Sequence, residues 1–169
     1  MKVRRAIIKD LKRVQDLYGI VSDEMAGTIY DIMWRRDIYP SKKEIVKDIR
    51  HHELYVLEKD NKIIGAMVLN HEYDECYNKL SWQIFADDDE VLILHRLCIH
   101  PQYRGCGKFL IKQAIEIAKF LNQQLIRLDL LGTNKPAIYL YEKCGFLLQG
   151  YQTMDYGEPV VAGLYERLI

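Results

Sequence analysis

The chain has 169 residues, of which 49% are hydrophobic and 28% are charged, and its formal net charge is zero. This length fits one domain, residues 1–169, with a substantial apolar core, and the balanced charge argues against a nucleic-acid binder, which would usually be basic. No apolar stretch approaches the roughly 18 residues of a membrane span, and the N-terminal apolar run is too short for a secretory signal. We therefore expect a cytoplasmic domain that binds neither nucleic acid nor membrane.

The cysteines and histidines lack the spacing of a metal site. The four cysteines show no C-x-x-C pair, which is typical of reduced thiols in a cytoplasmic protein. The five histidines show neither H-E-x-x-H nor a Cys/His ligand pattern. We expect no metal in this protein.

The N-terminal segment predicts a strand followed by a helix. Residues 2–8 form a short β-rich run. Asp10 suits the N-cap of a helix, because the apolar residues from Leu11 to Val21 then recur at helical spacing.

A second helix and a hairpin follow. Ser41 lies three residues before Glu44, which is the spacing of a capping box and predicts a helix start. Residues 54–70 contain two β-rich runs around Asp60–Asn61, and this pattern predicts a β-hairpin.

The second half of the chain predicts alternating strands and helices. The run at residues 90–100 is apolar on both faces, as in a central strand of a sheet. Gly145 is a natural residue to end a helix. The strand–helix–strand unit in this half should be parallel, so we expect an α/β (α+β) fold with a mixed sheet. The predicted order of strand, helix, strand, helix and strand covers residues 90–100, 109–121, 125–131, 134–146 and 160–169.

The stretch HPQYRGCGKFL, residues 100–110, places two glycines where a central strand leads into a helix. A helix start offers free N–H groups and a dipole that favours an anion, and glycine lets a phosphate approach the backbone. Arg104 and Lys108 add positive charge. The alternative is a plain turn into a helix. The P-loop and Rossmann glycine patterns both fail here, so we expect neither a nucleoside triphosphate nor a dinucleotide.

Two motifs occur in order in the second half of the chain. The first, Q/R-x-x-G-x-G/A, is matched by Gln102, Gly105 and Gly107. The second, N-x-x-A-x-x-x-Y-x-x-x-G-F, is matched by Asn134, Ala137, Tyr141, Gly145 and Phe146. Together they resemble the GNAT acetyltransferase superfamily, with a close match over residues 91–146. The resemblance implies a mostly antiparallel central sheet that contains one parallel strand pair and has helices on both faces. It also implies that acetyl-coenzyme A donates an acetyl group to a small-molecule or peptide amine, often in a homodimer.

One departure from the family pattern concerns the glycine loop. Family loops commonly read R-G-x-G-x-G after H-P-x-Y, and the loop here is two residues shorter. We expect this contraction to change the pyrophosphate contacts and to weaken coenzyme binding. It also favours an alternative function, a non-catalytic coenzyme A-binding domain for sensing or interaction. A third possibility is an enzyme that transfers a longer acyl chain.

The resemblance implies a set of coenzyme-binding residues. The backbone of the central strand would pair with the pantetheine arm, the glycine loop would hold the pyrophosphate, and the start of the last helix would contact the pantetheine or adenosine. The strand residues are Leu97, Cys98 and Ile99, the loop residues are Gln102, Arg104, Gly105, Cys106, Gly107 and Lys108, and the helix residue is Asn134.

Tyr141 matches the family's tyrosine that protonates the departing thiolate as a general acid. Without the resemblance, a simple packing role is the more common explanation for such a tyrosine. Tyr139, two residues earlier, would face another side of the helix. Cys98 and Cys106 have no paired base in the local sequence. The resemblance implies direct transfer rather than an acyl-cysteine.

The acceptor amine must lose a proton before it attacks, so a base is needed. Glu72 is the first candidate for this base. The acidic and aromatic residues of the segments 70–82 and 86–90 suit a cationic amine, through carboxylate pairing and cation–π contacts. The other candidates for the base are Asp74, Glu75 and His95.

Overall fold

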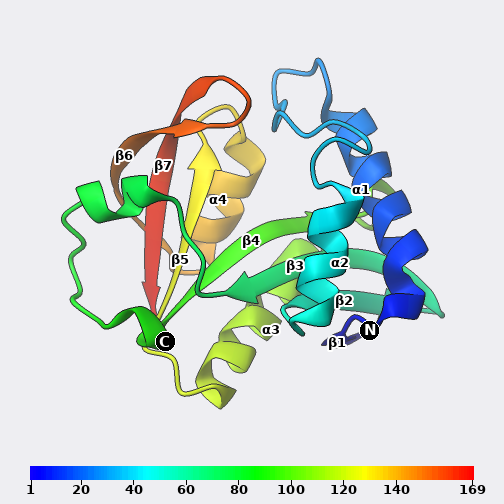
Figure 1. The fold of residues 1–169 in the computed structure, drawn as a ribbon, viewed down its shortest axis with the longest axis horizontal. Coiled ribbons are helices and arrows are strands. Elements are labelled where there is room, and N and C mark those ends of the chain that lie inside the picture. Colours follow the sequence, from blue (N-terminus) through cyan, green and yellow to red (C-terminus); the bar gives the residue numbers. More distant parts are fainter.

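The computed structural model describes residues 1–169 and contains one seven-stranded sheet (Figure 1). The strand order is β1-β2-β3-β4-β5-β7-β6. Only β4 and β5 are parallel, and every other neighbouring pair is antiparallel. This confirms the mixed sheet that the sequence predicts. The strands are β1 (Lys2–Arg5), β2 (Leu54–Lys59), β3 (Lys62–Asn70), β4 (Val91–Ile99), β5 (Leu125–Leu131), β6 (Leu147–Asp155) and β7 (Pro159–Leu168).

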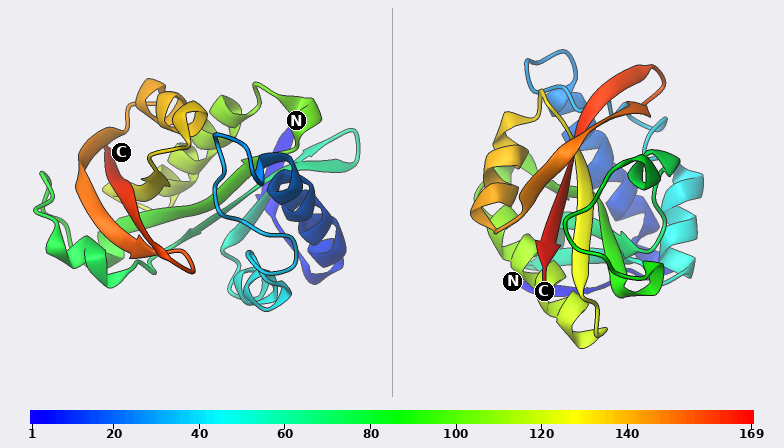
Figure 2. Two further views of the ribbon diagram at one scale, coloured as in Figure 1. Left: turned by 90° about the horizontal axis from the view of Figure 1, so that it is seen from above. Right: turned by 90° about the vertical axis from the view of Figure 1, so that its left-hand side faces the viewer.

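Two helices cover each face of the sheet (Figure 2). One main hydrophobic cluster lies under α1 and α2, and another lies under α3 and α4. Because both faces are covered, β3 is buried from Ile63 to Asn70. No helix is long and apolar enough to span a membrane. The helices are α1 (Leu11–Met25), α2 (Lys42–Arg50), α3 (Gly107–Phe120) and α4 (Lys135–Lys143).

Two helix ends form as their sequence signals predict. The Ser41 hydroxyl accepts from the Glu44 N–H at 3.3 Å, and the Glu44 carboxylate accepts from the Ser41 N–H at 2.7 Å, which completes the capping box of α2. Gly145 has φ +85°, and the Phe146 N–H donates to the Tyr141 carbonyl at 3.1 Å. This closing pattern is a Schellman motif, and it ends α4 at the predicted position.

Helix α1 starts directly after Asp10 as predicted, but the preceding strand is shorter and the cap hydrogen bond is missing. Strand β1 ends at Arg5, because residues Ile8–Asp10 already form a 3₁₀ turn. Asp10 precedes α1, but its carboxylate does not cap that helix. It accepts instead from the Ile7 N–H at 2.9 Å and from the Arg4 guanidinium at 2.6 Å. Arg4 lies on β1, and its long side chain reaches the Asp10 carboxylate. The carboxylate therefore bonds the guanidinium and not the first N–H groups of α1.

Strands β4 and β5 separate along their length, and this feature positions the site. They pair only between Val91–Ile93 and Leu125–Arg127. Farther along β4 the pairing with β3 shifts register, and Arg96 has φ +49°. Such a β-bulge bends its strand. The edge of β4 that faces β5 is therefore left without a strand partner beyond Ile93, and the sequence did not predict this bulge.

Candidate active site

A cavity of about 810 Å³ lies where β4 and β5 separate. Its lining comes from both faces of the sheet, so the cavity reaches from one helix layer to the other. We call its two parts the α4 side and the α2 side. The α4 side is lined by Leu128, Asn134, Ala137, Leu140 and Tyr141, and the α2 side by Trp34, Tyr39, Glu44, Glu72, Tyr73, His95, Arg96, Asp129 and Tyr156.

Tyr141 lies on the α4 side and is only 5% exposed. Its ring packs edge-on against Phe146, with 5.3 Å between the ring centroids. Its hydroxyl has no hydrogen-bond partner in the protein, although the residue lines the cavity. Burial raises the pKa of Tyr141, so the hydroxyl keeps its proton at neutral pH. Tyr139 is 59% exposed on another side of α4, as the helical spacing predicts.

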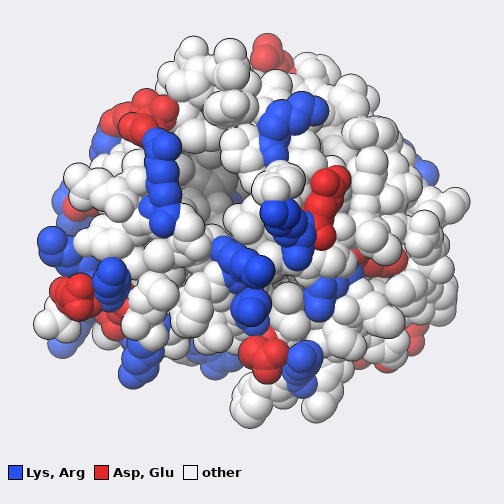
Figure 3. All heavy atoms as spheres, turned by 180° about the vertical axis from the view of Figure 1, so that it is seen from behind, with Lys and Arg blue, Asp and Glu red and all other residues white.

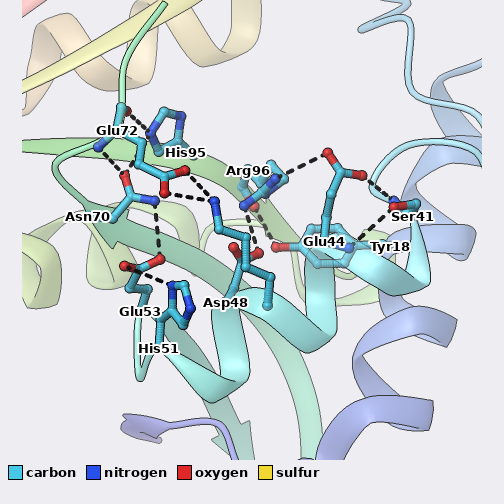
Figure 4. A network of polar contacts seen from close by, with 11 residues as sticks. Tyr18, Ser41, Glu44, Asp48, His51, Glu53, Asn70, Glu72, His95 and Arg96 are labelled. Carbon is cyan, nitrogen blue, oxygen red and sulfur yellow. Dashed lines mark hydrogen bonds and ion pairs between the residues drawn. The ribbon is translucent and has the colours of Figure 1, made fainter.

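His95 lies on the α2 side, and its hydrogen bonds define its tautomer (Figure 4). Its Nε2 lies 2.9 Å from the Glu72 carbonyl oxygen and 3.1 Å from Asn70 Oδ1. Both oxygens are acceptors, since Asn70 Oδ1 also accepts from the Glu72 N–H. The ring proton therefore sits on Nε2, and Nδ1 carries a lone pair with no protein donor. Burial lowers the pKa of His95, so the ring is neutral at pH 7.

The other predicted bases are placed less favourably. Glu72 lines the cavity, but its carboxylate lies 2.6 Å from Lys47 Nζ, and this hydrogen bond lowers the pKa of Glu72. Asp74 also lines the cavity, and its carboxylate accepts from the Cys76 N–H at 2.8 Å. Glu75 does not line the cavity. Glu72 and Asp74 therefore line the cavity, but each carboxylate already accepts a hydrogen bond from another protein group.

Arg96 is the one Lys or Arg residue that lines the cavity, and acids surround it (Figure 4). Its guanidinium lies 2.6 Å from Asp48 and 3.8 Å from Glu44. Burial raises the pKa of Asp48 to about 6 and outweighs the lowering effect of the arginine. Tyr18 on α1 donates to the Arg96 carbonyl at 3.0 Å and so holds the bulge of β4. The single basic group of the cavity is therefore already matched by carboxylates.

Asp129 on β5 is a cavity residue that sequence analysis missed. Its carboxylate accepts hydrogen bonds from the hydroxyls of Tyr77, at 2.9 Å, and of Tyr156. Both partners are neutral, and no lysine or arginine pairs with it. A signal was present, because an acidic residue inside the apolar strand LIRLDLL is unusual. The two tyrosines come from distant segments, and their approach was not readable from the sequence.

The two glycines before α3 have different roles. Gly105 has φ +90°, and a Cβ built there would meet no atom within 4 Å, so its backbone is open. Gly107 is buried, and a Cβ there would lie 2.7 Å from Leu140 Cδ2. The second glycine therefore lets α3 approach α4. The N–H groups of Gly107, Lys108 and Phe109 donate to no protein atom, which leaves them free for an anion.

The molecular face that carries α3 and α4 shows lysines and arginines around a hollow (Figure 3). Near the start of α3, the Arg104 side chain is 85% exposed, and Gln102, Gly105 and Lys108 are also exposed. Cys106 is half-buried beside them. This distribution suits a ligand with several negative charges.

The remaining predicted coenzyme residues lie along the split. Leu97 lines the cavity, whereas Cys98 and Ile99 do not. All three lie on the part of β4 whose edge toward β5 is unpaired. Burial raises the pKa of Cys98 to about 12, so its thiol stays protonated and is a poor nucleophile. Asn134 lines the cavity at the N-terminus of α4, where its side chain accepts from the Ala137 N–H at 3.4 Å.

The acidic run at residues 86–90, which was expected to suit the acceptor, does not line this cavity. Asp88 lines a second cavity of about 280 Å³, and its carboxylate accepts from the Tyr73 hydroxyl at 2.9 Å. No three His, Cys, Asp or Glu side chains cluster as metal ligands, and the four cysteines are unpaired.

The sequence matches the family model described as "Acetyltransferase (GNAT) family" over residues 20–146. The YwnH protein of Bacillus subtilis strain 168, named as a phosphinothricin acetyltransferase, is 26% identical over 164 residues, which cover 92% of this chain and 91% of the relative. The streptothricin acetyltransferase of Escherichia coli is 30% identical over 128 residues, which cover 72% of this chain and 64% of the relative.

Solved structures share the fold. An acetyltransferase of the GNAT family from Streptococcus agalactiae superposes with a TM-score of 0.85 at 20% identity, covering 99% of this chain and 95% of that one. YncA from Salmonella typhimurium, solved with acetyl-coenzyme A, has a TM-score of 0.69 at 15% identity and covers 99% and 93% of the two chains. At these identities the likeness establishes the fold alone.

Proposed function

The chain belongs to the GNAT acetyltransferase family, and we propose on this basis that it moves an acetyl group from acetyl-coenzyme A to a primary amine of a small molecule or peptide by direct transfer. The observation that carries the proposal is the unpartnered hydroxyl of Tyr141, which faces a cavity open to both layers of the molecule. The two substrates could then meet in the split between β4 and β5 from opposite faces of the sheet. Both curated relatives are named as acetyltransferases, which supports the reaction class.

The coenzyme fits the α4 side and the loop before α3. The unpaired edge of β4 offers backbone groups to the pantetheine arm, and the free N–H groups at the start of α3 suit the pyrophosphate. The open backbone at Gly105 allows close approach of a phosphate. We assign binding to Leu97, Cys98, Ile99, Gln102, Arg104, Gly105, Cys106, Gly107, Lys108 and Asn134.

When bound, acetyl-coenzyme A supplies a thioester whose C–S bond breaks as the amine nitrogen forms a C–N bond. A lysine-like amine is neutral in only about one molecule in 2,500 at pH 7, so the enzyme must remove a proton. Nδ1 of His95 takes this proton, and the hydroxyl of Tyr141 gives its own proton to the departing sulfur. His95 passes this first proton to solvent and then takes the second proton, which the nitrogen loses as the C–N bond forms. Solvent takes that proton as well and restores the proton of Tyr141, so one turnover releases one proton in net.

The base was expected to be Glu72, and the geometry favours His95 for this role. The Glu72 carboxylate is held by Lys47, and its lowered pKa makes it a weaker base. The backbone carbonyl of Glu72 instead orients the His95 ring through the Nε2 hydrogen bond. We therefore place Glu72 at the rim of the cavity, where it positions the base.

Replacing Tyr141 with phenylalanine tests this function. We expect Tyr141→Phe to lower kcat by about 10²- to 10⁴-fold, because the acid is lost, while calorimetric binding of acetyl-coenzyme A is retained. The assay follows release of free coenzyme A thiol with a panel of amines that includes phosphinothricin and streptothricin. Tyr139→Phe is the matched control and should keep full activity.

The alternative, a non-catalytic coenzyme A binder, gives a different result. Such a protein would bind the coenzyme with no amine-dependent thiol release in the unmodified chain. Turnover that survives in Tyr141→Phe would show that another group protonates the sulfur. Absence of coenzyme binding would remove the enzymatic proposal altogether.

A further inference from the structure

We propose that the α2 side of the cavity selects an acceptor with two positive charges, one on the reacting nitrogen and one that pairs with Asp129. This inference rests on the proposed acetyl transfer and names its substrate class. The Asp129 carboxylate lines the cavity and receives only two phenolic hydrogen bonds, from Tyr77 and Tyr156. A carboxylate in a partly buried site without a cation nearby favours a cationic ligand.

The other charged residues of the cavity also favour a cationic acceptor. Five acidic residues line it, and Arg96 is the single Lys or Arg side chain among them. The positive charge of Arg96 is matched by Asp48 and Glu44, so it is not free for a substrate carboxylate. An acceptor with acidic groups would meet repulsion on this side. The acidic lining residues are Glu44, Glu72, Asp74, Asp129 and Asp155.

A second cation is needed because the reacting nitrogen cannot remain charged. It loses its proton before it attacks, and a substrate with one amine would then leave Asp129 without a counterion. A diamine keeps one ammonium group for Asp129 while the other is deprotonated. Trp34 and Tyr73 also line this side and are the aromatic residues left for a cation, since the Arg96 guanidinium already lies over the Tyr39 ring, 5.9 Å from its centroid.

Tyr141 identifies the reacting centre, and this evidence does not depend on the acidic residues of the cavity. Tyr141 is 5% exposed, and its unpartnered hydroxyl lines the same cavity from the α4 side. The hydroxyl is not among the fully enclosed polar atoms, so it is open to a ligand in the cavity. The cavity thus offers one site for the thioester sulfur and another, at Asp129, for the cationic end of the acceptor.

The test compares two acceptors of the same carbon chain, the diamine cadaverine and the monoamine pentylamine, with acetyl-coenzyme A as donor. We expect kcat/KM to be about 10- to 100-fold higher for cadaverine, which is the usual contribution of one charge-assisted hydrogen bond. The Asp129→Asn variant should lose this preference, mainly through a higher KM for the diamine. L-Glutamate, an amine with two carboxylates, should be a poor acceptor for the unmodified enzyme.

Asp89→Asn is the matched control. Asp89 is an exposed carboxylate that lines neither cavity, so its variant should keep the preference. Equal use of the two amines by the unmodified enzyme would overturn the inference even if Asp129→Asn failed to fold. A preference that survives in folded Asp129→Asn would also overturn it. If thiol release occurs with no amine at all, the proposed function fails, and this inference fails with it.

Discussion

The two sides of the cavity are built in different ways. The α4 side and the loop before α3 come from one stretch of the chain, from Leu97 to Tyr141, and they offer backbone groups and helix ends. The α2 side is assembled from side chains of five separate segments. Backbone recognition suits a fixed coenzyme, whereas a side-chain surface can be remodelled for another acceptor without disturbing the coenzyme site. The five segments of the α2 side are residues 32–44, 70–74, 95–96, 129 and 154–157.

This difference explains why the motif residues identify a family but not a substrate. The matched motif positions lie around the start of α3 and in or next to α4, and none lies on the α2 side. The two curated relatives are named for different acceptors. The charge of the α2 side is therefore the feature from which the acceptor of this chain is inferred.

The largest expected effect is on the α2 side, at the proposed base. We expect His95→Gln to lower kcat by about 10²- to 10⁴-fold, because glutamine can keep the hydrogen bond to the Glu72 carbonyl but cannot take a proton. Glu72→Gln is the control and should change kcat by less than about tenfold, since the carbonyl that orients His95 remains. A larger loss of kcat in Glu72→Gln than in His95→Gln would show that Glu72, and not His95, is the base.

The pH profile of kcat also distinguishes His95 from Glu72 as the base. A base works only when unprotonated, so activity falls as the pH drops through its pKa. Burial lowers the pKa of His95 from 6.5, so the acid limb should lie below pH 6.5 and be absent in His95→Gln. If Glu72 were the base, the acid limb would lie below pH 4.5, because Lys47 lowers the pKa of Glu72.

A smaller effect is expected in the loop that serves the α4 side. Gly105→Ala should lower the free energy of unfolding by about 1 to 3 kcal/mol, because alanine is strained at φ +90°. It should also weaken calorimetric binding of acetyl-coenzyme A. Gly132→Ala is the control, since Gly132 has open space and no positive φ, and it should change neither quantity. Equal stability of the two variants in denaturant would contradict a special backbone requirement at Gly105.

The smallest effect is expected where α1 supports the bulge of β4. Tyr18→Phe removes the hydrogen bond to the Arg96 carbonyl and should lower the free energy of unfolding by about 0.5 to 1.5 kcal/mol. The Tyr30 hydroxyl makes no such bond to the strand, so Tyr30→Phe should have the stability of the unmodified protein in a urea titration. An unchanged midpoint for Tyr18→Phe would mean that the bulge holds without α1.

Much of the fold was predictable because its signals are local. The capping box at Ser41 and the glycine end of α4 depend on residues a few positions apart, and both form as predicted. Asp10 is the N-cap residue of α1 as predicted, but its carboxylate makes no cap hydrogen bond, because it pairs with Arg4 on β1. Arg4 in turn also bonds Glu58 on β2, so the whole arrangement depends on strand pairing. A local sequence pattern cannot reveal a partner that only strand pairing brings close.

The order of the elements, the family resemblance and the motif residues Asn134, Ala137 and Tyr141 of the α4 side could be read from the sequence alone. These follow from periodicity and from motifs of closely spaced residues. The point where β4 and β5 separate, the position of the acidic run at 86–90 outside the cavity, and the contact of Asp129 with two tyrosines and no cation emerge only in the folded chain. The reason is physical: a bulge and a shared cavity arise from the packing of segments far apart in the chain, and their energy is fixed only when the whole sheet has formed.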